Sequence, residues 1–130
     1  MERIPAYWGQ RFTIAFARLR DGRSPGAEFY DALPIGDKAK LNNLFRLMAD
    51  EGRIANAEKC GVLDKGLFEF KSFQIRMPFA YSRERGLILI THGFRKQKDK
   101  APKEEITRAW RILKEDQERA ELPDVKRKGT

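Results

Sequence analysis

The chain has 130 residues, of which 27 are basic and 19 acidic, so its formal net charge is +8 at neutral pH. A chain of this length buries roughly two thirds of the surface that its unfolded form exposes, and it is expected to form a single domain over residues 1–130. Cys60 is the only cysteine and His92 the only histidine, which excludes an internal disulfide and the usual zinc-ligand patterns, so no metal or other cofactor is expected.

The first half of the chain predicts one strand, two helices and a loop. Apolar residues alternate over residues 11–20, as in a half-buried strand. A serine and a proline favour a helix start in the segment 24–33. The segment 37–52 has apolar residues three and four apart, which predicts a helix with one buried face. Residues 60–66 are rich in turn residues and predict an ordered loop. The apolar residues that define these elements are Phe12, Ile14 and Phe16, then Leu41, Leu44, Phe45 and Met48.

The second half predicts strands followed by one helix. Residues 67–79 have a period of two, with Phe68, Phe70, Phe73, Ile75 and Met77 opposed to Glu69, Lys71, Gln74 and Arg76. The polar stretch 82–86 predicts a hairpin turn into the aliphatic run 87–90, which is expected to be a central strand. Pro102 and two following glutamates favour a last amphipathic helix, with Trp110 on its packed side. The charged residues 117–130 predict a loosely ordered basic tail.

This order of elements predicts an α+β fold. The sheet is expected to be small and mostly antiparallel, with an N-terminal helix pair, a C-terminal helix and a core over about residues 11–116. Helices are expected to cover one face of the sheet, and the other face is a candidate open surface. No apolar run reaches the length of a signal peptide or a membrane span, so a soluble cytoplasmic protein without a membrane partner is expected.

The charge excess is concentrated in one part of the chain. Residues 95–114 contain eight basic and three acidic side chains, and they directly follow His92 and the predicted central strand. One interpretation is a solvated loop and helix surface. The other is a phosphate site, in which an imidazole and several ammonium groups share one corner of the molecule. Arg76 has the same two interpretations: a solvated sheet edge, or a donor that joins Lys71 in binding a phosphate on the open sheet face.

Four segments together resemble a known family. They are LFEFK (67–71), FQIRM (73–77), GLILI (86–90) and THGFRKQKDKAPKEEI (91–106). The region from about Leu63 to Leu113 resembles the RelE/HigB superfamily of bacterial toxins, especially the phage-derived HigB-like branch, with a looser match from Phe12 onward. The resemblance implies a microbial-RNase-like domain that serves as the toxin of a type II toxin–antitoxin system. Such a toxin cleaves mRNA on the ribosome without a metal, and a helix-turn-helix antitoxin silences it.

Cleavage of RNA by its own 2′-hydroxyl group requires a base, an acid and cations that stabilise the phosphorane. Through the resemblance, the catalytic residues are expected to be His92, Arg76 and Lys96, with His92 transferring protons and the other two stabilising charge. The residues expected to position the RNA phosphates are Lys71, Arg95, Lys98 and Lys100. Two other functions stay open: a ParE-like gyrase poison of the same fold, and a noncatalytic nucleic-acid-binding protein.

Overall fold

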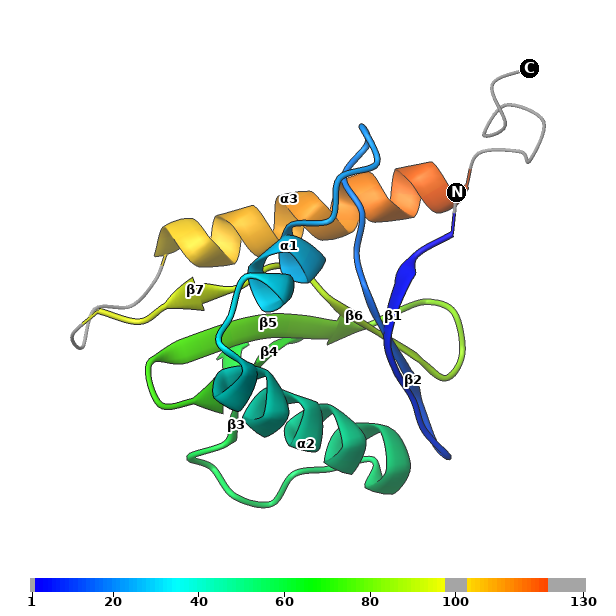
Figure 1. Cartoon of the computed structure of the whole chain (residues 1–130). Coiled ribbons are helices and arrows are strands. Elements are labelled where there is room, and N and C mark those ends of the chain that lie inside the picture. Colours follow the sequence, from blue (N-terminus) through cyan, green and yellow to red (C-terminus); the bar gives the residue numbers. More distant parts are fainter. Residues whose placement is uncertain (1, 98–102, 122–130) are drawn as a thin grey trace.

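The computed structural model describes residues 2–97 and 103–121, and it confirms an α+β fold with a mostly antiparallel sheet (Figure 1). The elements are β1 (Ile4–Trp8), β2 (Thr13–Phe16), α1 (Pro25–Asp31), α2 (Ile35–Glu51), β3 (Cys60–Asp64), β4 (Leu67–Ser72), β5 (Ile75–Tyr81), β6 (Leu87–Ile90), β7 (Phe94–Arg95) and α3 (Lys103–Ala120). None of the helices in these two ranges has the length and apolarity needed to cross a membrane.

The seven strands form one open sheet in the order β1-β2-β6-β5-β4-β3, and the short strand β7 also pairs with β5. Only β2 and β6 run parallel. Strand β6 lies in the middle of the sheet, as its continuous aliphatic run predicts. The predicted hairpin turn at 82–86 is confirmed, because it joins the antiparallel strands β5 and β6.

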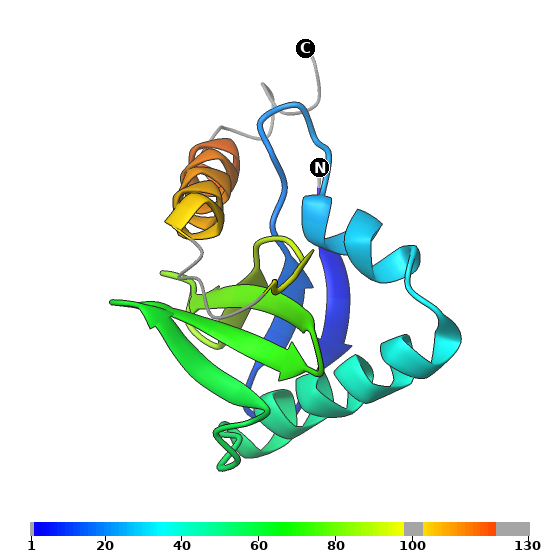
Figure 2. The same ribbon diagram turned by 90° about the vertical axis from the view of Figure 1, so that its left-hand side faces the viewer.

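Helices lie on both faces of the sheet (Figure 2). Helices α1 and α2 cover one face, where Ile14, Phe45 and Phe79 belong to the main core. Helix α3 covers part of the opposite face, where Ile112 packs with Ala15 and Leu89. The expectation of a sheet covered on one face is therefore wrong. The physical reason is that β2 and β6 carry apolar side chains on both faces of the sheet, so each face needs a covering layer.

Helix α2 illustrates how the local sequence determines an element. Its apolar residues at helical spacing form its buried face. It ends at Gly52, which has a φ of 79° and donates its N–H to Met48 O at 2.9 Å, a left-handed end that favours glycine. Helix α1 begins at Pro25, but Ser24 does not cap it with its side chain, because its hydroxyl donates to Ala17 O at 2.9 Å.

Three terminal or edge segments differ from the predictions. Strand β1 lies before the predicted core, pairs with β2 and packs Ala6 and Tyr7 against it. The predicted loop at 60–66 contains strand β3, which pairs with β4 at the edge of the sheet. Helix α3 continues to Ala120, so residues 117–120 are helical rather than part of the predicted tail.

Trp110 does not pack inward as predicted. It is 39% exposed, and its Nε1–H donates to Asp64 Oδ2 at 3.0 Å.

Candidate functional site

Three charged side chains of one β-hairpin lie on the face of the sheet that α3 partly covers. In β5, Ile75, Met77 and Phe79 point into the core under α2, so Arg76 lies on the opposite face. The same alternation in β4 places Glu69 and Lys71 on that face. The pairing register puts Lys71 directly opposite Arg76, and the side chains of such cross-strand pairs are neighbours.

Lys96 joins this group from the other side of β5. Strand β7 pairs with β5 so that Phe94 lies opposite Arg76. Lys96 is two residues further along, and its backbone N–H donates to Gln74 O at 2.7 Å. Glu69, Lys71, Arg76 and Lys96 are hereafter called the Glu69 cluster.

The charges of the other three residues of the cluster act on Glu69. Burial raises the pKa of Glu69, whereas the charges of Arg76, Lys71 and Lys96 lower it, and the net result is a raised pKa. Burial makes a carboxylate more basic, while neighbouring cations favour its ionised form. A half-buried base surrounded by cations can accept a proton and stabilise an adjacent oxyanion.

Arg76 is held in place through its own hairpin. Its Nη1 donates to Phe73 O at 2.6 Å and to Ile75 O at 3.0 Å. Its Nε is buried and has no hydrogen-bond partner within the described ranges. A buried donor without a partner is costly in free energy, and guanidinium groups are frequent partners of phosphate oxygens. Arg76 is therefore a candidate anion-binding group of the Glu69 cluster.

His92 lies between β6 and β7, where the pairing with β5 is interrupted. Thr91 N–H donates to Pro78 O at 2.9 Å, but Pro78 has no N–H with which to continue the ladder. The chain leaves the sheet at this point and rejoins it at Phe94. The side chain of His92 is fully buried, and its ring stacks on Phe94 with centroids 5.7 Å apart.

Both ring nitrogens of His92 have partners. Nδ1 lies 2.8 Å from Thr91 Oγ1, and Nε2 lies 3.0 Å from Glu105 Oε1 in the first turn of α3. Burial lowers the pKa of His92 to about 4, although the hydrogen bond to Glu105 raises it. The ring is therefore neutral at pH 7. Because a carboxylate only accepts, Nε2–H donates to Glu105 and the Thr91 hydroxyl donates to Nδ1.

The segment 28–114 matches the family described as phage derived protein Gp49-like (DUF891). The match runs from α1 into α3, covers well over half of the chain and includes the whole Glu69 cluster. The chain belongs to this family. Gp49-like proteins are associated with RelE-like toxins of toxin–antitoxin systems. No curated protein matches the chain.

The residues that the sequence predicts for the site of this Gp49-like protein separate into four groups. Arg76, Lys96 and Lys71 come together. Arg95 is exposed, but it pairs opposite Ile75 and so lies on the other face of the sheet. Lys98 and Lys100 lie outside the described residues. His92, which is expected to transfer protons, is fully buried beside Phe94, and both of its ring nitrogens have partners, one of them in α3.

The sequence analysis did not single out Glu69. The signal was present, because the period of two places Glu69 on the same face as Lys71 and Arg76. Its importance depends on the register between β4, β5 and β7, which a single sequence does not reveal. Within residues 2–97 and 103–121, no three histidine, cysteine, aspartate or glutamate side chains are arranged to hold a metal ion.

Proposed function

We propose that this Gp49-like protein is the toxin of a type II toxin–antitoxin system and an endoribonuclease that cleaves mRNA on the ribosome without a metal. The observation that carries the proposal is the half-buried Glu69 carboxylate, with a raised pKa, beside Arg76, Lys71 and Lys96. Such a site contains the base and the cations that RNA transesterification requires. The family, with its association with RelE-like toxins, supports the same activity.

In the proposed reaction, Glu69 accepts the proton of the 2′-hydroxyl group, whose oxygen attacks the adjacent phosphorus. Arg76 and Lys71 stabilise the negative charge of the phosphorane. The bond to the 5′-oxygen then breaks, and Lys96 donates the proton that this leaving group needs. The products are a 2′,3′-cyclic phosphate and a free 5′-hydroxyl end. This scheme transfers the role of the base from His92, which is buried, to Glu69.

The test compares wild type with Glu69→Gln, Arg76→Ala and Lys96→Ala in a translating extract, where mRNA ends are mapped. Glu69→Gln is expected to lower cleavage about 10²–10⁴-fold, because general base catalysis contributes about that much. Glu58→Gln and Lys65→Ala are matched controls at exposed positions and are expected to cleave like wild type.

Other outcomes identify the alternative functions. If all variants cleave equally, the Glu69 cluster is not the active site. Growth inhibition with intact mRNA would indicate a gyrase poison, and RNA binding without any cleavage would indicate a noncatalytic binding protein. The proposed partner is a helix-turn-helix antitoxin, and rescue of growth on its co-expression is the corresponding measurement.

A further inference from the structure

Phe73 occupies an unusual position at the tip of the β4–β5 hairpin. Ser72 pairs with Ile75, so Phe73 and Gln74 form a two-residue turn. Phe73 has a φ of 54°, and it is the only residue other than glycine with a positive φ in the described ranges. A positive φ at the first position of such a turn normally favours glycine, asparagine or aspartate. The ring is also 70% exposed, although the alternating pattern of the sequence predicts an inward orientation.

Two lysines from other elements approach the ring of Phe73. Lys40 Nζ, from α2, lies 4.3 Å from the ring centroid, and Lys59 Nζ, from the segment before β3, lies 5.7 Å away. Both are within cation–π range. Neither ammonium group forms an ion pair with a carboxylate in the part of the chain that the structure describes. An exposed aromatic ring is therefore flanked by two positive charges that carboxylates do not neutralise.

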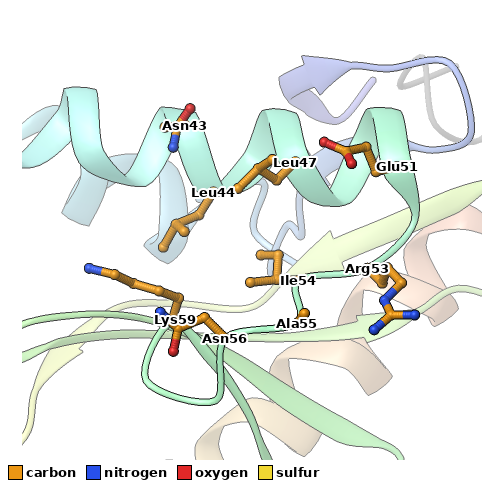
Figure 3. A pocket seen from close by; sticks show the side chains of 9 residues that line it. All are labelled: Asn43, Leu44, Leu47, Glu51, Arg53, Ile54, Ala55, Asn56 and Lys59. Carbon is orange, nitrogen blue, oxygen red and sulfur yellow. The ribbon is translucent and has the colours of Figure 1, made fainter.

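The surface beside this ring is concave. A pocket of about 440 Å³ lies between α2 and the segment before β3, and Lys59 is one of the residues that line it. Figure 3 shows Lys59 extending along the pocket below Leu44, with Ile54 and Ala55 opposite α2. The charged residues that line the pocket are Lys59, Arg53 and Glu51. Lys59 therefore connects the pocket with the ring of Phe73.

We propose that Phe73, with Lys40 and Lys59, is a binding site for one unpaired base of single-stranded RNA. The base stacks on the ring of Phe73, and the two ammonium groups bind the flanking phosphates. This combination of an aromatic platform with nearby cations is how proteins hold single strands without reading their sequence. The charge of +8 on the chain favours a polyanion at this surface.

The stacking site is physically connected to the Glu69 cluster. Arg76 Nη1 donates to the carbonyl oxygen of Phe73 itself, and Gln74 accepts from the backbone of Lys96. A base on Phe73 would therefore be held by the same hairpin that carries Arg76. The inference rests on the proposed function, and it identifies the ring of Phe73 as the group that holds one base of the mRNA that is cleaved.

The experiment measures binding of a labelled 2′-O-methyl RNA decamer, which lacks the attacking hydroxyl groups, to wild type and variants. Phe73→Leu and Phe73→Gly are expected to weaken binding roughly 5- to 150-fold, the effect typical of losing one stacked base. Phe73→Tyr is expected to retain it. Phe73→Gly is expected to be no less stable to heat than wild type, because glycine adopts the positive φ without strain. Lost binding then reflects the missing ring and not misfolding.

Control variants show whether the effect on binding is specific to this surface. Trp8→Ala removes a similarly exposed aromatic ring, 74% exposed on the edge strand β1, and is expected to bind like wild type. Lys40→Gln and Lys59→Gln are each expected to reduce the salt dependence of binding by about 0.7 in log–log slope. If Phe73→Leu and Phe73→Gly bind RNA like wild type, the stacking site is refuted.

Three outcomes separate failure of the stacking site from failure of the proposed function. If wild type cleaves mRNA and the Phe73 variants bind and cleave equally well, only the stacking site is wrong. If wild type neither cleaves mRNA nor binds the decamer, the proposed function and the stacking site both fail. If the Phe73 variants keep RNA binding but escape neutralisation by the antitoxin, the surface is a protein interface and the inference is overturned.

Discussion

Replacing Arg3 with alanine is expected to remove a large share of the stability, because Arg3 compensates the buried carboxylate of Asp116. Asp116, in α3, is 2% exposed. Its Oδ1 accepts from Arg3 Nε at 3.0 Å and from Arg3 Nη2 at 2.8 Å, and its Oδ2 accepts from Arg18 N–H at 2.8 Å. This network joins the N-terminal strand pair to the last helix.

The magnitude follows from the geometry. Removing one partner of a buried ion pair typically costs about 3–5 kcal/mol, because the other charge stays buried without compensation. The side chain of Arg3 is itself 20% exposed, which places Arg3→Ala near the lower end, at about 3 kcal/mol. Asp116→Asn added to Arg3→Ala is expected to cost less than the sum of the two single changes, because both remove the same interaction.

The assay is urea unfolding followed by tryptophan fluorescence. With a slope of about 1–3 kcal/mol per molar urea, Arg3→Ala is expected to lower the unfolding midpoint by about 1–3 M. Arg20→Ala is the matched control, because Arg20 pairs with Glu118 at an exposed position, where ion pairs contribute little. Equal midpoints for Arg3→Ala and Arg20→Ala would mean that the Asp116 carboxylate does not need Arg3 as its partner.

Two further predictions concern His92 and its neighbour Gly93. The pKa of His92 is lowered from 6.5 to about 4. Between these two pH values the unfolded chain binds a proton that the folded chain does not. The free energy of unfolding is therefore expected to fall by about 3 kcal/mol as the pH drops from 6.5 to 4. Urea midpoints measured at several pH values check this prediction. If the midpoint of His92→Gln depends on pH as strongly as that of wild type, the prediction is contradicted. A Cβ atom on Gly93 would lie 2.0 Å from the ring of Phe29, so Gly93→Ala is expected to cost about 1–3 kcal/mol. Gly36→Ala, where the added Cβ meets open space, is the control, and equal melting temperatures for the two variants would show that the contact is soft.

Local sequence patterns were sufficient for the long elements. The helical spacing of apolar residues predicted α2 and the start of α3, and the aliphatic run predicted β6 as a central strand. In these elements, the spacing of apolar residues along the sequence shows which side chains are buried. Strands β1 and β3 were missed because they lie at the two edges of the sheet, where their residues are mostly exposed or half-buried and show little hydrophobic patterning.

Phe73 shows that a correctly recognised alternation of apolar residues can still predict the wrong orientation for one side chain. The alternation through residues 73–77 is real, but the register of β4 and β5 makes residues 73 and 74 a turn. The aromatic ring therefore points outward to Lys40 and Lys59 instead of into the core. Turn position depends on cross-strand pairing, which the residue types of one strand do not encode.

The α+β class, the main helices and the face of β4 and β5 on which Lys71 and Arg76 lie could all be obtained from the sequence alone, because they follow from periods of two and 3.6 along the chain. The tertiary structure was needed to show that Glu69 and Lys96 join them and that His92 is buried against α3. These placements depend on strand order, register and helix packing, which bring together residues that are distant in the chain.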